Sequence, residues 1–187
     1  SLQCLATLNS DLVIEKLQDL DLPRITLDFD GTVISCGDSV AWARRGYNPH
    51  NRHAKSYYPL LCHIAQSGHF LHVKNRPGNR HDSKGGALNV IRNCIDQIRL
   101  NCPGVIIEVR LDAAFFTEEI LGFLIKSKVE FAVKMPMWKK TGIKDVINAR
   151  QRWKRSSTRL SWFRHTLYFG KWDLGIDVII FRQKISD

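Results

Sequence analysis

One segment, RITLDFDGTVIS at residues 24–35, constrains the fold more than any other part of the chain. Three apolar side chains alternate there with Thr26, Asp28 and Asp30, and a period of two predicts a β-strand. Side chains two residues apart on a strand point to the same side of its sheet, so the two aspartates share a face. The fold must therefore contain a sheet whose first strand presents two carboxylates.

The segments after this strand predict an alternation of strands and helices. An antiparallel hairpin turns at QSGH, and a long amphipathic helix follows it. An apolar strand, a second helix and a last strand complete the series. In chain order these segments are 57–65 and 70–76 (hairpin), 83–100 (helix), 105–115 (strand), 118–128 (helix) and 129–136 (strand).

Capping residues fix where the helices begin. Asp82 or Ser83 can cap the long helix, and Thr117 can cap the next one. A further helix is predicted at 11–20, whereas residues 38–56 are polar, basic and irregular.

The element order is thus β-β-β-α-β-α-β. An antiparallel meander followed by strands joined through helices gives a mixed sheet with helices packed on it, the order of the ribonuclease H-like α/β fold. We expect three parts: an N-terminal helical segment at 1–22, this core at 23–136, and a basic β-rich segment at 137–187. The strands of the last part are predicted at 159–169 and 176–184.

The charge of the chain indicates a polyanionic partner. Lysine and arginine number 28 against 18 acids, a net charge of +10. Binding a polyanion with such a surface releases counterions, which favours nucleic acid. The candidate contacts to a DNA backbone are Arg44, Arg45, Lys55, Arg76 and Arg80. Trp42, Trp153 and Trp162 lie among the basic clusters and either stack on bases or belong to a core.

Other classes of protein find less support in the sequence. No apolar run reaches the roughly 18 residues of a membrane span, and no secretory signal is visible, so we expect a cytoplasmic protein without a membrane partner. The five cysteines are scattered without a C-x-x-C pair, which predicts free thiols.

Two chemistries compete for the segment LDFDGTV. It resembles the signature of the haloacid dehalogenase-type phosphatases, which implies Asp28 as a covalent nucleophile and Asp30 as the acid for the leaving group. That family also needs a downstream acidic cluster for magnesium, and KWDLGID and RLDAAFF match it poorly. The predicted antiparallel hairpin at 57–76 also departs from its parallel β-α units.

The alternative is a metal-dependent nuclease. In a ribonuclease H-like sheet the first strand lies parallel to the strand after the long helix, so Asp30 would face Asp112. Two such carboxylates can hold divalent ions about 3.5–4 Å apart for phosphodiester cleavage, and oxygen ligands favour Mg²⁺ or Mn²⁺. Asp112 could instead only cap a helix, and Asp28 could only form hydrogen bonds beside the site.

Several separate blocks of sequence resemble the DDE transposases of bacterial insertion sequences. They are LDFDGTV, GYNPHNRHAKSYYPLLCHIAQSGHFLHVKNRPGN and VRLDAAFFTEEILGFLIKSKVEFAVKMP. The resemblance implies that Asp30 and Asp112 are the first two catalytic acids and that the basic tail is a β insertion. It also implies DNA transposition at transposon ends and into a target, and assembly on two DNA ends, as in a homodimer.

The third acid of that family does not appear. It is a glutamate in a stretch resembling Tyr-x-x-Arg-x-x-Ile-Glu, and nothing similar follows FRQKISD. We therefore expect a fragment or truncated product, which leaves open whether the chain is an active enzyme or a non-catalytic DNA-binding remnant.

Overall fold

The computed structural model describes residues 2–46, 48–49, 51–138, 141–169 and 172–184. The chain forms two compact units, one ending at Lys134 and the other beginning at Met135. Each unit is described by itself.

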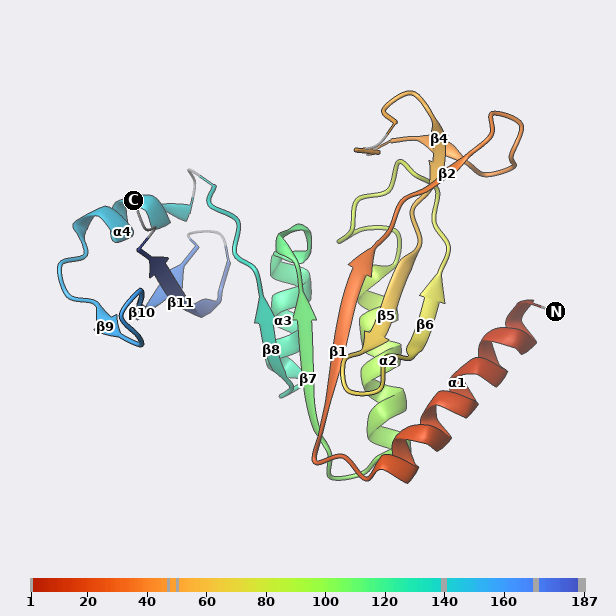
Figure 1. The fold of residues 1–187 in the computed structure, drawn as a ribbon, viewed down its shortest axis with the longest axis horizontal. Coiled ribbons are helices and arrows are strands. Elements are labelled where there is room, and N and C mark those ends of the chain that lie inside the picture. Colours follow the sequence, from red (N-terminus) through yellow and green to blue (C-terminus); the bar gives the residue numbers. More distant parts are fainter. Residues whose placement is uncertain (1, 47, 50, 139–140, 170–171, 185–187) are drawn as a thin grey trace. The chain divides into compact units, whose positions relative to one another are not determined.

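A five-stranded mixed sheet forms the centre of the first unit (Figure 1). Its strand order is β6-β5-β1-β7-β8; β5 is antiparallel to both of its neighbours, β6 and β1, and β1, β7 and β8 are parallel. The strands are β1 (Arg24–Gly31), β5 (Leu60–Ile64), β6 (Phe70–Lys74), β7 (Ile106–Leu111) and β8 (Glu130–Val133). With α2 (Ala87–Asn101) before β7 and α3 (Glu118–Lys126) before β8, this confirms the predicted ribonuclease H-like order.

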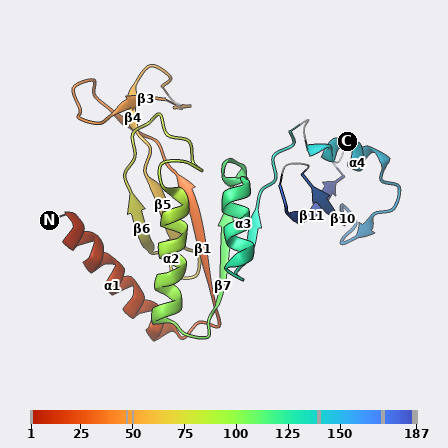
Figure 2. The ribbon, with the colours of Figure 1, turned by 180° about the vertical axis from the view of Figure 1, so that it is seen from behind.

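The helices of this unit pack on one face of the sheet, as the view from behind shows (Figure 2). Helix α1 (Leu2–Leu20) is longer than predicted and joins α2 and α3 in the same apolar core. The core side of β1 consists of Ile25, Leu27 and Phe29, all buried. Because side chains alternate along a strand, Asp28 and Asp30 lie on the opposite, polar face.

One predicted helix cap is wrong and one is confirmed. Helix α2 begins after Gly86, whose φ of 82° needs no side-chain cap, and Asp82 and Ser83 are buried in the preceding loop instead. The glycine takes over because it alone adopts such a backbone conformation without strain. Thr117 does cap α3, because its hydroxyl oxygen accepts a hydrogen bond from the Ile120 amide at 3.4 Å.

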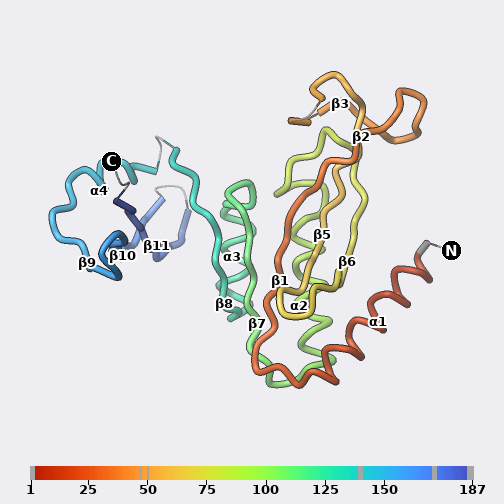
Figure 3. The backbone as a smooth tube through the Cα atoms, in the orientation of Figure 1, coloured from red at the N-terminus to blue at the C-terminus, as the bar shows by residue number. Residues whose placement is uncertain are grey.

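A second sheet extends from the end of the segment predicted as the first strand across the region 38–56 that was predicted to be irregular. Strands β2 (Ile34–Cys36), β3 (Arg44–Arg45) and β4 (Lys55–Tyr57) pair antiparallel in the order β2-β4-β3. The backbone trace runs from the carboxyl end of β1 directly into it (Figure 3). The sheet is fastened to the loop after β6, where the Gly78 amide donates to the Ser56 carbonyl at 2.8 Å.

The second unit is a small sheet of order β11-β10-β9 with one helix. The two predicted strands are present as β10 (Leu160–Tyr168) and β11 (Gly175–Gln183), and the sequence pattern missed α4 (Ile143–Ala149) and β9 (Lys154–Arg155). Two of its tryptophans contact the chain's own cations: Arg182 lies 4.2 Å from the centre of the Trp153 ring, and Lys154 lies 5.1 Å from that of Trp162. In the part of the chain that the structure describes, no helix has the length and apolar character needed to cross a membrane.

Candidate metal-binding edge

Asp30 and Asp112 meet at the carboxyl edge of the sheet. Strands β1 and β7 are parallel, and the last pair in their register is Phe29 with Leu111. Asp30 directly follows Phe29 and Asp112 directly follows Leu111, and both aspartate side chains are exposed. The structure therefore brings together the two acids that the sequence pattern selected.

Local backbone geometry orients both carboxylates. Asp30 Oδ1 accepts the Gly31 amide at 2.8 Å, and Asp112 Oδ1 accepts the Ala114 amide at 2.9 Å at the start of a 3-10 turn, Ala113–Phe115. Phe115, fully buried, anchors that turn in the core. Asp112 thus caps a turn directly after β7, and its charge acts on Asp30. Among the described residues nothing donates to the other oxygen of either carboxylate, so both remain free to bind a cation.

Electrostatics at this edge favour an added positive charge. Partial burial raises the pKa of Asp30; the Gly31 amide opposes this, and the charges of Asp112 and Asp82 add to it. The charges of Asp112 and Asp82 therefore act on Asp30, and two exposed carboxylates with free oxygens suit a hard divalent cation whose remaining ligands are water and phosphate. Within the described ranges no three His, Cys, Asp or Glu side chains are grouped to hold a metal ion on their own.

Asp82 belongs to a buried clamp behind Asp30. Its Oδ2 accepts the Tyr58 hydroxyl at 2.8 Å, and its Oδ1 pairs with Arg76 Nη2 at 3.3 Å. The Arg76 side chain is 2% exposed and also donates to the carbonyls of Tyr58, Asp82 and Lys84 at 3.0–3.2 Å. Because both of its oxygens already accept hydrogen bonds, Asp82 contributes negative charge near Asp30 but has no unoccupied oxygen to bind a cation.

The side chains of the clamp pack closely against Gly31 at the end of β1. A β-carbon added to Gly31 would lie 2.3 Å from Asp82 Oδ1 and 2.5 Å from Tyr58 Cζ. No side chain larger than hydrogen fits there, which explains the glycine directly after Asp30. Burial and the Asp82 carboxylate raise the pKa of Tyr58, so its hydroxyl stays a donor. Sequence reasoning missed this role of Tyr58 and Asp82, since no local pattern links residues so far apart.

Asp28 is held in a salt bridge on the polar face. Its two oxygens accept Arg110 Nε and Nη2 at 2.5 and 2.6 Å, and His63 Nδ1 lies 3.8 Å away. A bidentate arginine gives this carboxylate a structural partner on the neighbouring strand. The antiparallel pairing of β1 with β5 is also foreign to the parallel β-α units of the phosphatase alternative, which finds no support here.

The candidate DNA contacts divide into two groups. Arg44 and Arg45 on β3 and Arg80 in the loop before α2 are exposed, and Lys55 is half-buried with its ammonium group donating to the Asp38 carbonyl. Arg76 differs from them: its guanidinium group is buried and occupied by the clamp, which leaves it no surface to offer a DNA backbone.

Comparison with known proteins places the chain in a family. The model of the family "Transposase DDE domain group 1" matches residues 2–179, and no curated protein sequence matches. Similar solved structures include a Mos1 transposase paired-end complex with the left transposon end (10% identity, TM-score 0.43, covering 78% of this chain and 54% of that chain). A piggyBac transposase synaptic complex with hairpin DNA is 11% identical, with a TM-score of 0.47, covering 89% of this chain and 34% of that one. The catalytic domain of Mos1 mariner transposase is 12% identical, with a TM-score of 0.37, covering 81% and 73%.

This chain spans about half the length of the Mos1 transposase in the paired-end complex. The family match extends over nearly the whole chain, from α1 through β11. The chain therefore belongs to the transposase DDE domain group 1 family.

Proposed function

We propose that this chain carries the first two metal-binding acids of a DNA transposase, Asp30 and Asp112. The observation that supports this most directly is the parallel register of β1 and β7, because the ends of both strands, which carry the two carboxylates, lie at the same edge of the sheet. Membership of the family supports DNA transposition, and the reaction that we propose is hydrolysis of a phosphodiester bond at a transposon end followed by strand transfer into target DNA.

The chain's residues contribute position and charge to this chemistry. A divalent ion, Mg²⁺ or Mn²⁺, would activate the attacking oxygen and stabilise the leaving oxygen. Asp30 and Asp112 would hold it through their free oxygens, while the Gly31 and Ala114 amides fix the orientation of the carboxylates. The Tyr58–Asp82–Arg76 clamp keeps the end of β1 in place.

Surface cations of the first unit would supply the contacts to DNA. Backbone phosphates would be bound by the exposed side chains of Arg44, Arg45 and Arg80 and by the half-buried Lys55. Each neutralised phosphate releases counterions, so binding should weaken steeply as salt is added. Assembly as a homodimer on two DNA ends and a bacterial origin are further parts of the proposal that rest on the family resemblance. A cytoplasmic location is also proposed, on the sequence pattern alone.

The test is cleavage of supercoiled plasmid DNA with Mn²⁺. We expect nicking by the wild type that disappears in Asp30→Ala and in Asp112→Ala. Asp28→Ala is the matched control, since Asp28 lies on the same strand two residues away but is bound to Arg110, and it should retain nicking. Nicking that survives in both acid variants would refute the proposal, as would its loss only in Asp28→Ala.

A second candidate function is DNA binding without catalysis. The exposed basic residues of β3 and of the loop before α2 favour it, because their charge does not depend on the acids. Salt-sensitive DNA binding without cleavage in Mn²⁺ would support this alternative, whereas absence of binding at low salt would reject both functions.

A further inference from the structure

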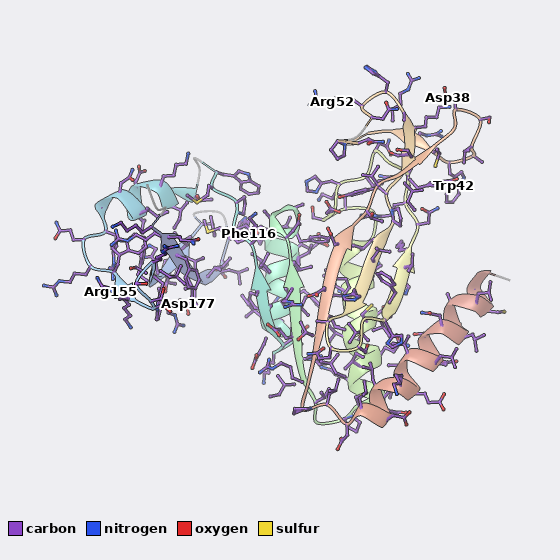
Figure 4. All side chains as sticks on the ribbon, viewed as in Figure 1. Asp38, Trp42, Arg52, Phe116, Arg155 and Asp177 are labelled. Carbon is purple, nitrogen blue, oxygen red and sulfur yellow. The ribbon has the colours of Figure 1, made fainter. Side chains whose placement is uncertain are left out.

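Trp42 stands out on the second sheet of the first unit. It is 74% exposed, the largest exposed fraction of any described tryptophan, and its φ of 67° lies in the left-handed region. A bulky residue in that conformation is strained by about 1–2 kcal/mol, and such strain persists where the surroundings impose it and is concentrated at functional positions. Figure 4 shows the labelled side chain at the surface of the loop between β2 and β3.

Hydrogen bonds brace the loop that carries this ring. The Tyr57 hydroxyl donates to the Ala41 carbonyl, directly before Trp42, and the Lys55 ammonium group donates to the Asp38 carbonyl. Ala43, directly after the tryptophan, is buried. The backbone is therefore fixed on both sides of Trp42 while its ring stays in solvent, which is the arrangement of a preformed binding surface.

The surroundings of Trp42 are positively charged. Residues 32–57 contain four lysines and arginines against a single acid, Asp38. Arg44 and Arg45 on β3 and Arg52 in the following loop are exposed. An exposed aromatic face with nearby cations matches the binding of unpaired nucleic acid, in which bases stack on the ring while the phosphates meet the cations.

The same sheet is packed against the acid edge, the edge of the main sheet that carries Asp30 and Asp112. Strand β2 begins three residues after β1 ends at Gly31, and the loop after β6 bonds to Ser56 through Gly78. Gly46 and Gly78 approach so closely that a β-carbon on Gly46 would lie 1.9 Å from the Gly78 carbonyl oxygen. Two residues before Gly78 is Arg76 of the clamp, so this sheet and Asp30 share one packed support.

We propose that Trp42 is a stacking platform for an unpaired or terminal nucleobase of the DNA held at the acid edge. The inference rests on the proposed function and adds to it the class of ligand: a base with a free face. Inside a duplex both faces of each base are already stacked, so the platform discriminates frayed or single-stranded ends from continuous duplex.

The test compares two DNA substrates in EDTA, which makes the readout independent of metal and of Asp30 and Asp112. One is a duplex with a short single-stranded overhang containing 2-aminopurine, and the other is a closed dumbbell duplex whose ends are joined by ethylene glycol linkers, so that it has no free end and no unpaired base. Affinities are measured by fluorescence anisotropy at low salt. We expect Trp42→Ala to weaken binding of the overhang roughly 5- to 150-fold, the range for loss of one base–aromatic stack, with less than about threefold change for the dumbbell.

Matched variants separate stacking from general apolar contact and from folding. Trp42→Phe keeps an aromatic face and should retain most of the affinity and the quenching of 2-aminopurine. Val40→Ala removes exposed apolar surface from the same loop and should change neither. Because φ at Trp42 favours glycine, Trp42→Gly should keep a Tm equal to or above that of the wild type while losing overhang binding.

Equal affinity of Trp42→Ala and the wild type for the overhang would overturn the inference and leave the proposed function standing. An equal loss for both substrates would also overturn it, as would a Tm that falls together with binding in Trp42→Gly. If the wild type binds neither substrate at low salt, the proposed function fails and the platform fails with it.

Discussion

Replacing Arg76 with methionine tests whether the buried clamp stabilises the acid edge. The Arg76 and Asp82 side chains are 2% and 11% exposed, and the guanidinium group also satisfies three carbonyls. Methionine fills much of the volume but leaves the Asp82 carboxylate buried without its cation. Removing one partner of a buried pair typically costs about 3–5 kcal/mol, because an uncompensated charge remains.

This loss converts to a measurable change in Tm. With an unfolding entropy of about 2.1 cal/mol/K per residue, a unit ending at Lys134 loses about 3–4 °C per kcal/mol, so Arg76→Met should lower Tm by about 10–18 °C. Circular dichroism at 222 nm reports mainly on the first unit, which contains α1, α2 and α3. A double variant, Arg76→Met with Asp82→Leu, should recover at least half of the loss, because no unpaired charge is left.

The control is Arg110→Met on the same sheet. The Arg110–Asp28 contacts are shorter, 2.5 and 2.6 Å, but the side chains are 48% and 31% exposed. Solvent screens that pair, and its loss should cost only about 0.5–1 kcal/mol. Our reasoning that burial outweighs distance would be refuted if Arg110→Met were the more destabilising variant, or if Arg76→Met stayed within about 1 kcal/mol of the wild type.

Three further substitutions have defined outcomes. Gly31→Ala places a β-carbon 2.3 Å from Asp82 Oδ1 and should lower the free energy of unfolding by about 1–3 kcal/mol. It should also reduce the rise in Tm on adding Mn²⁺. Gly37→Ala, with no atom within 4 Å of its β-carbon, should change neither quantity. Burial and a neighbouring lysine lower the pKa of His72 in the folded protein. Protonation therefore favours the unfolded chain, and the free energy of unfolding should fall as the pH drops through the ordinary value of 6.5. His72→Gln should flatten this dependence in urea titrations at about pH 7.5 and about pH 5.5. Thr117→Ala removes the cap of α3 and should cost about 1 kcal/mol in the same titrations, whereas Thr117→Ser should cost little.

The main sheet was predictable because its strands follow simple periodic rules. Alternation in β1 gave both its buried face and the shared face of Asp28 and Asp30, and the helix before β7 required a parallel return beside β1. Once these two strands are parallel neighbours, their ends meet at one edge. The juxtaposition of Asp30 and Asp112 follows from topology alone, although their catalytic roles remain a proposal.

The clamp was not predictable from local sequence. Arg76 lies in the charged stretch RPGNRHD, which has the composition of an exposed loop. Its burial depends on Tyr58 and Asp82, which reach it through tertiary folding. The same contacts explain the wrong helix cap, since Asp82 binds Arg76 and Tyr58 while Gly86 takes the position directly before α2. The prediction that Arg76 contacts DNA and the prediction that Asp82 caps α2 have the same cause of error, because one buried ion pair takes both residues away from the surface.

The second sheet escaped prediction because strands of two or three residues are too short to show a period. Its placement nevertheless gives the consecutive residues Tyr57 and Tyr58 separate tasks. The hydroxyl of Tyr57 braces the loop of Trp42, and that of Tyr58 holds Asp82 behind Asp30. Neighbouring residues of extended chain point to opposite sides, so this short segment fixes the proposed base platform on one side and the acid edge on the other. A shift of one residue in the pairing of β4 would exchange the two side chains and disconnect both sites. The hydrogen bond from the Gly78 amide to the Ser56 carbonyl helps to hold this register.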